Sequence, residues 1–144
     1  MRVLLDTSVL VAAMVEGHPA HGQALPWLQR VRAGTDTGVV AAHSIVELYA
    51  VLTRLPVQPR ISPAIAQQVI ERNVLDICEI VAISAVDYAR VLAHLAATGI
   101  MGGATYDALI MYAAVKVEVD QILTLNEKDF RRIYPALAGK VSAP

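Results

Sequence analysis

The sequence predicts an α/β fold in which helices cover both faces of a short, mainly parallel central sheet. Two observations support this prediction. Short apolar runs of the kind found in doubly buried strands alternate with longer segments that carry helix start and stop signals. The 144 residues suit one domain and contain no internal repeat or interdomain linker. We therefore expect residues 1–144 to form a single three-layer α/β/α sandwich.

The first strand and the first two helices are expected near the N-terminus. Residues 3–5 form a continuous apolar run, as in a strand that is buried on both faces. Residues 6–8 (Asp-Thr-Ser) then offer a helix start before the apolar residues 9–15. A second helix is expected over residues 18–31, because Pro19 falls near the helix start, where proline is tolerated.

The middle of the chain continues the alternation. Residues 38–41 predict a weak second strand. Ser44 opens a helix to about Leu55, where two prolines follow and stop it. Ser62 stands at a cap position with a proline directly after it, so a further helix is expected over residues 63–74.

Two more strands and two more helices are expected towards the C-terminus. Residues 79–83 predict a third strand, and a serine cap then precedes a helix over residues 85–97. After a glycine-rich break, Thr105 opens a helix to about Val117. Residues 121–125 predict the last strand.

The composition indicates exposed apolar surface. Hydrophobic residues make up 56% of the chain, more than the ~45–50% typical of soluble domains. Part of this surface is expected to face a partner, either in a homodimer or in a hetero-oligomer with another protein. The formal net charge of −1 excludes the general basic character of many nucleic-acid binders, although it leaves room for a local basic rim.

The sequence predicts a soluble, cytoplasmic protein with no membrane-spanning segment. Residues 1–5 begin like a signal peptide, but Asp6 interrupts the apolar stretch too early. The nearly charge-free segment 91–115 is broken by glycines, a histidine and an aspartate. Cys78 is the only cysteine, so there is no disulfide framework, and it is expected to pack as a small hydrophobe.

Three acidic residues stand alone in uncharged surroundings. Asp6, Glu47 and Asp107 are each the only charged residue over a long segment. The helices around Glu47 and Asp107 are apolar nearly all round, and we expect them to be buried. Burying a carboxylate costs on the order of several kcal/mol, and these segments contain no lysine or arginine to offset that cost. A cation from elsewhere is therefore expected.

We expect these acids to converge at one edge of the sheet. Ligands of open α/β sheets bind beyond the carboxyl ends of parallel strands, where Asp6 follows the first strand. Asn126 and Asp129 follow the last strand in the same sense. Converging carboxylates repel unless some are protonated or a divalent cation lies between them. An oxygen-only cluster suits Mg²⁺ or Mn²⁺ better than zinc.

Each of these residues also has a structural explanation. Asp6 could cap the helix that follows it, and Asp107 could stabilise a helix N-terminus. Asn126 could cap a short helix, with Asp129 three positions further on. Glu47 lies neither at a helix start nor on a polar face, so a functional role is favoured there.

Two weaker features bear on the expected acidic site, which would lie in a groove at the edge of the sheet. His43 precedes Glu47 by one helical turn and could reach the groove, although a role at the helix start is favoured. Aromatic residues make up only 5% of the chain, so no stacking platform for a single strand is evident from the sequence.

Four segments carry a family resemblance that runs almost end to end. Residues 3–10 look like an opening strand with a first acid, residues 44–48 like a second, helical acid, and residues 106–110 like a third. Residues 124–130 look like a closing segment, with an asparagine in its first slot and an aspartate in its second. In order, spacing and length, the chain resembles PIN-domain ribonucleases, in particular the VapC-type toxins of bacterial toxin–antitoxin pairs.

The resemblance implies a Mg²⁺- or Mn²⁺-dependent endoribonuclease that cleaves RNA and is held in check by a cognate antitoxin, whose tail occupies the groove. The first and third acids are the expected metal ligands, the second completes the site directly or through water, and the aspartate or the asparagine of the closing segment supplies the fourth group. The expected site residues are thus Asp6, Glu47, Asp107, Asp129 and Asn126. Thr7 or Thr124 would orient a carboxylate.

Two other classes of protein share part of this pattern. Acid-phosphatase-like and receiver-like domains also bind Mg²⁺ beside an aspartate, but residues 6–8 lack their second aspartate and there is no adjacent acidic pair. A catalytically weak PIN-like module that binds RNA or a protein stays open as the alternative. Asn126 favours that alternative, whereas the three isolated acids count against it.

Overall fold

The central sheet has five parallel strands in the order β3-β2-β1-β4-β5. This computed structural model describes residues 1–144. The strands are β1 (Arg2–Leu5), β2 (Thr37–Ala41), β3 (Glu79–Val81), β4 (Gln121–Leu123) and β5 (Val141–Ser142). The helices are α1 (Thr7–Met14), α2 (His21–Arg32), α3 (Ala42–Leu52), α4 (Pro63–Ile70), α5 (Ala85–Thr98), α6 (Ala104–Val117) and α7 (Glu127–Ile133), with a π-helical turn η1 (Glu71–Leu75) and a 3₁₀ helix η2 (Pro135–Lys140).

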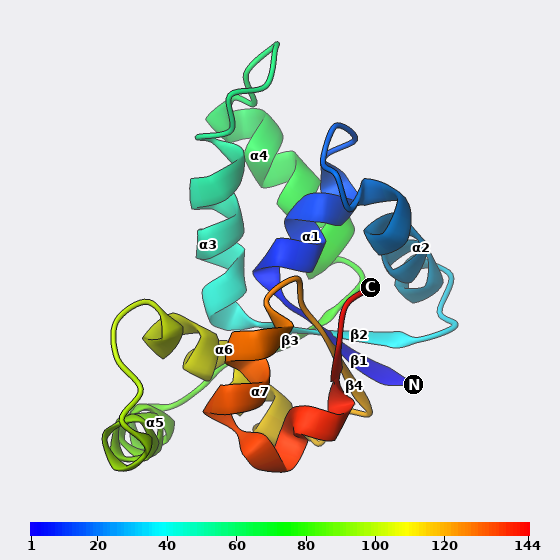
Figure 1. Ribbon diagram of the computed structural model, residues 1–144. Coiled ribbons are helices and arrows are strands. Elements are labelled where there is room, and N and C mark those ends of the chain that lie inside the picture. The colour runs from blue at the N-terminus through cyan, green and yellow to red at the C-terminus, as the bar shows by residue number, and fades with distance from the viewer.

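The two faces of the sheet carry separate apolar cores. In β1, Val3 and Leu5 pack into one core and Leu4 into the other, as the alternation of side chains along a strand requires. Helices α1 to α4 cover the first face, and α5 to α7 cover the second (Figure 1). The predicted three-layer sandwich with a parallel sheet is thus confirmed. No helix combines the length and the apolar character that crossing a membrane requires.

The carboxyl ends of the strands meet at one edge of the sheet. The strand order reverses at β1, which lies between β2 and β4, and α/β sheets commonly bind ligands at such a reversal. The backbone N–H of Asp6 donates to the carbonyl of Leu123 over 3.0 Å and joins the ends of β1 and β4. The residues that follow these two strands therefore leave the sheet side by side.

Strands β3 and β4 each end earlier than predicted, before residues 83 and 125. The carbonyl of Ala82 accepts a hydrogen bond from Lys116 instead of one from a neighbouring strand. The hydroxyl of Thr124 accepts the N–H of Asn126, two residues further along the chain, which closes a turn there. Strand β5 was not predicted, because a strand of two residues is too short to show a hydrophobic period.

Several helix boundaries also differ from those predicted. Helix α2 begins later than expected, because His18 Nδ1 accepts the N–H of Ala20 and closes a turn ahead of it. Helices α3 and α6 begin before Ser44 and Thr105, so neither residue is the predicted cap. The helix predicted over residues 63–74 changes to π-type hydrogen bonding in its last turn.

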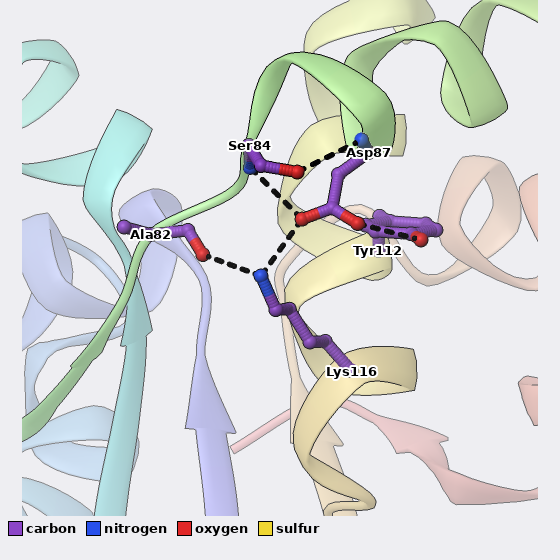
Figure 2. Close-up of polar contacts among 5 residues, drawn as sticks. All are labelled: Ala82, Ser84, Asp87, Tyr112 and Lys116. Carbon is purple, nitrogen blue, oxygen red and sulfur yellow. Dashed lines mark hydrogen bonds and ion pairs between the residues drawn. The ribbon is translucent and has the colours of Figure 1, made fainter.

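A polar network fixes α5 against α6 (Figure 2). Ser84 is the predicted cap: its hydroxyl accepts the N–H of Asp87 over 3.2 Å, and the Asp87 carboxylate accepts the N–H of Ser84 over 2.9 Å. Lys116 of α6 donates to that carboxylate over 2.7 Å and to the Ala82 carbonyl, and the Tyr112 hydroxyl donates to the other carboxylate oxygen. The Lys116 ammonium and the capping hydrogen bonds hold the pKa of Asp87 well below its usual range.

Asp87→Asn is expected to lower the melting temperature by more than about 5 °C near neutral pH, because the substitution breaks a partly buried, hydrogen-bonded ion pair. Since the pKa of Asp87 is lower in the folded state than its ordinary value of 3.8, its stabilising contribution is present above that value and is lost as the pH falls below it. The difference in melting temperature between Asp87→Asn and the unaltered protein should therefore become smaller at acidic pH. Thermal unfolding followed by circular dichroism at several pH values measures this, and Asp76→Asn is the control because Asp76 is exposed and unpaired. Equal melting temperatures for the two variants would contradict the expectation.

Candidate active site

Asp6 is buried at the junction of β1 and α1. Its Oδ2 accepts hydrogen bonds from the hydroxyls of Ser8 over 2.6 Å and Thr124 over 2.8 Å. It occupies the N-cap position of α1, but its side chain makes no capping hydrogen bond, so capping does not explain the carboxylate. Burial raises the pKa of Asp6, and the two hydroxyls oppose that rise. No ion pair compensates this charge.

Glu47 reaches the same region from the middle of α3. Its Oε2 accepts a hydrogen bond from the Thr7 hydroxyl over 3.2 Å and lies 3.5 Å from Nε2 of His43, which lies in the first turn of α3. Burial raises the pKa of Glu47, and the charge of Asp6 adds to that rise. The expectation of an entirely buried helix is wrong, since Val46 is 65% exposed. The reason is that α3 packs against α1 and α4 and leaves its outer face open.

Asp107 lies half-buried in the first turn of α6 and has no ion-pair partner. Burial raises the pKa of Asp107 to about 6, and the negative charges of Asp6, Glu47 and Asp129 contribute to that rise. A position in the first turn agrees with the explanation that Asp107 stabilises the N-terminus of its helix. That explanation does not require three other acids nearby. The four acids from four separate segments therefore converge.

Asn126 directs its amide nitrogen towards two of these acids. Its Nδ2 donates to Asp129 Oδ2 over 3.0 Å and lies 3.4 Å from Asp107 Oδ2, within hydrogen-bonding reach. It occupies the N-cap position of α7 without a side-chain capping bond. Asp129 Oδ1 also lies 3.5 Å from the guanidinium of Arg132. Both candidates for the fourth position thus reach the acidic cluster, one as a charge and the other as a neutral donor.

An open cavity of about 370 Å³ lies beside the cluster. It is lined by six residues from the start and middle of α3 and the start of α6, namely His43, Val46, Glu47, Gly103, Tyr106 and Asp107. No lysine or arginine lines it. Two of the predicted site residues thus open directly onto the cavity, whereas Asp6, Asn126 and Asp129 lie outside its lining.

The donor set fits a hard divalent cation in its chemistry. The four acids offer carboxylate oxygen, the ligand type that Mg²⁺ and Mn²⁺ prefer. The carboxylates do not form a closed coordination shell: no three acidic, histidine or cysteine side chains are placed to hold one ion together. Mg²⁺ keeps several waters and is commonly held by one or two carboxylates and by substrate phosphate, so it needs no such cage.

Sequence reasoning missed Ser8. Its hydroxyl donates to Asp6 and accepts a backbone N–H from the turn after β4, so it ties α1 to that turn. The available signal was a hydroxyl two residues after an acid at a strand end, from where it can reach back. Thr7 and Thr124 both hydrogen-bond to a carboxylate, as predicted, Thr7 to Glu47 and Thr124 to Asp6.

Comparison with known proteins finds similarity along most of the chain. The family model described as PIN domain matches residues 3–135. Ribonuclease VapC40 of Mycobacterium tuberculosis is 40% identical over 114 residues, which cover 76% of this chain and 75% of that protein. Ribonuclease VapC27 of the same organism is 32% identical over 112 residues, which cover 78% and 76%.

Solved structures share the fold at lower sequence identity. The crystal structure of Mycobacterium tuberculosis VapC20, described as a sarcin–ricin loop cleaving toxin, superposes with a TM-score of 0.64 at 16% identity and covers 83% of this chain and 86% of that one. The structure of VapBC2 from Rickettsia felis, bound to a DNA fragment from its promoter, superposes with a TM-score of 0.63 at 23% identity and covers 92% of each chain.

Proposed function

The chain belongs to the PIN domain family, and from that premise we propose that it is a metal-dependent endoribonuclease and the toxin of a toxin–antitoxin pair. The similarity to two ribonucleases of the VapC type supports the activity. The single observation on which the proposal depends is the convergence of four acids at one edge of the sheet, where Asn126 bridges Asp107 and Asp129 and the hydroxyls of Thr7 and Thr124 hold Glu47 and Asp6. The raised pKa of Asp107, to which the charges of the other three acids contribute, agrees with this.

The acids would share the work of holding Mg²⁺ or Mn²⁺. Asp6 and Asp107 are the proposed ligands, because neither has an ion-pair partner in the fold. Glu47 completes the site directly or through water, and Asp129 or Asn126 supplies the fourth group. When bound, the ion supplies the positive charge that activates water for in-line attack on a phosphodiester and stabilises the leaving oxygen.

The hydroxyl residues around the acids position the ligands. Ser8 and Thr124 both donate to Oδ2 of Asp6, so neither of these hydrogen bonds occupies its Oδ1. Thr7 restrains Glu47 in the same way. Hydrogen bonds of this kind orient a carboxylate and commonly affect metal affinity about 10- to 100-fold.

Incubation of purified, antitoxin-free protein with total cellular RNA, with and without Mn²⁺, tests this function. New RNA ends that appear only with Mn²⁺ are expected, and mapping them identifies the substrate. Binding of RNA without any new ends would contradict the nuclease and favour the alternative, a catalytically weak PIN-like module that binds RNA or a protein. The neutral Asn126, which offers a donor rather than a charge, is the observation that supports that alternative.

The second part of the proposal concerns the partner, the domain and the cellular compartment. We propose a cognate antitoxin as partner, the 144 residues as one domain, and the cytoplasm as the place where the protein meets RNA. The relation to VapBC assemblies supports the antitoxin.

Self-association is expected as well, because the outer faces of the helices leave large apolar side chains uncovered. Val86 and Leu92, both on α5, are 61% and 68% exposed. Light scattering of the antitoxin-free protein at micromolar concentration is expected to give the mass of at least a dimer. A monodisperse monomer would contradict this expectation.

A further inference from the structure

Two aromatic rings lie parallel at the rim of the acidic site. The centroids of the His43 and Tyr106 rings are 5.6 Å apart, and their planes differ by 4°. His43 precedes Glu47 by one turn of α3, and Tyr106 directly precedes Asp107 in α6. Both rings line the same cavity as those two acids. The ring pair is therefore held at a fixed place beside the acids.

The fold itself does not explain Tyr106. Its exposed fraction is 57%, and it packs against neither of the two apolar cores. His43 is stacked against Tyr106, and its Nε2 lies 3.5 Å from Oε2 of Glu47. Val46 lines the same cavity and is 65% exposed. The cavity thus has an apolar, aromatic wall that faces solvent next to its acidic one.

The charges of the cavity restrict how RNA can be held there. Its lining includes two carboxylates and no lysine or arginine, so the phosphate backbone finds no fixed cationic partner in the lining. A nucleobase, by contrast, has an uncharged aromatic face that stacks on a tyrosine without regard to base identity. The wall therefore complements a base, whereas the acids complement a divalent cation, which would in turn hold the scissile phosphate.

We propose that Tyr106, backed by His43, is a stacking platform for one unpaired nucleobase next to the phosphate that is cleaved. This inference rests on the proposed ribonuclease function and names the kind of RNA that the site takes. A base inside a duplex already has both faces covered by its neighbours, so the platform selects single-stranded or looped RNA. His43 is a positioning residue, because it fixes the plane of the tyrosine ring.

The test compares three variants on a short single-stranded RNA with Mn²⁺. Tyr106→Leu keeps an apolar, smaller side chain but removes the flat ring. It is expected to raise KM about fivefold with kcat little changed, since stacking binds ground state and transition state alike. Tyr106→Phe is expected to behave like the unaltered protein. Tyr49→Leu is the matched control, because Tyr49 is also exposed but lies in the neighbouring groove between α3 and α4.

Two further measurements separate stacking from other causes. An RNA with a single abasic position next to the cleaved bond is expected to remove the difference in KM between Tyr106→Leu and the unaltered protein. A single 2-aminopurine in the RNA reports stacking without cleavage, when Ca²⁺ replaces Mn²⁺ at the oxygen ligands. Its fluorescence is expected to be quenched by the unaltered protein and by Tyr106→Phe, but not by Tyr106→Leu.

The outcomes are distinct. Equal KM values, or equal quenching by Tyr106→Leu and the unaltered protein, would overturn the platform and leave the ribonuclease proposal standing. If the unaltered protein cleaves no RNA, the ribonuclease proposal fails, and the quenching measurement decides on the platform alone. If Tyr106→Leu changes only the mass seen by light scattering, Tyr106 belongs to a protein interface and the platform is wrong.

Discussion

Asp107→Asn is expected to reduce metal-dependent RNA cleavage by more than about a hundredfold while the protein stays folded. The substitution keeps the shape of the side chain and removes one ligand charge from the proposed metal site. Single-turnover cleavage at saturating Mn²⁺ measures the loss, and circular dichroism checks the fold. Asp76→Asn makes the same chemical change at an exposed position and should cleave normally. Unchanged cleavage by a folded Asp107→Asn protein would remove Asp107 from the site.

The same substitution is expected to stabilise the metal-free protein by about 1 to 2 kcal/mol near neutral pH, less than the full pKa shift would give, because solvent screens the half-exposed side chain. The pKa of Asp107 is raised from 3.8 to about 6 in the folded state, so the folded protein binds this proton more tightly than the unfolded chain does. The contribution of Asp107 to stability is therefore most favourable below pH 3.8 and is lost as the pH rises towards 6. Thermal unfolding in EDTA should show the advantage of Asp107→Asn shrink as the solution is acidified. An advantage that is independent of pH would contradict this reasoning.

The sequence predicted the architecture because strand and helix signals were separate and regular along the chain. Apolar runs such as residues 3–5 are buried on both faces in the structure, which is what a continuous run predicts. The caps were predicted unevenly. Ser84 caps α5 with its own hydroxyl. Ser44, by contrast, lies inside α3, which begins directly after β2, and the buried hydroxyl of Ser44 has no hydrogen-bond partner. A local cap signal does not reveal where the preceding strand stops pairing.

The candidate site was predicted as a set of acids, but its hydrogen bonding was only partly foreseen. Isolation in an uncharged segment was enough to select Asp6 and Asp107. The direction of the Asn126 amide and the ring pair of His43 and Tyr106 depend on how α3, α6 and the turn after β4 approach one another. These contacts join residues far apart in the chain, so no local pattern contains them.

The fourth position can be assigned by comparing Asp129→Ala with Asn126→Ala. Asp129→Ala is expected to raise the Mn²⁺ concentration for half-maximal cleavage by at least about tenfold, and more than Asn126→Ala does. An ionised aspartate offers a cation both charge and lone pairs, whereas asparagine offers one neutral oxygen. In this structure Asn126 also turns its nitrogen, not that oxygen, towards the acids.

The choice of pH makes this comparison decisive, because the two substitutions move the pKa of Asp107 in opposite directions. The charge of Asp129 raises that pKa, and the hydrogen bond from Asn126 lowers it. Asp129→Ala therefore helps Asp107 to ionise, whereas Asn126→Ala hinders it. At about pH 8, well above a pKa of about 6, Asp107 is ionised in both variants, and the metal titration reports ligand loss alone.

At a pH near the Asp107 pKa of about 6, protons compete with Mn²⁺ for Asp107 in addition to the loss of a ligand. The difference in Mn²⁺ requirement between the two variants should therefore narrow. Glu127→Ala is the control, because Glu127 lies in the same turn but forms an ion pair with Arg131 and is not part of the acidic cluster. Its metal requirement should match that of the unaltered protein at both pH values. A larger effect of Asn126→Ala at the higher pH would mean that the amide rotates its oxygen onto the metal, and that Asp129 serves to position Asn126 through their 3.0 Å hydrogen bond.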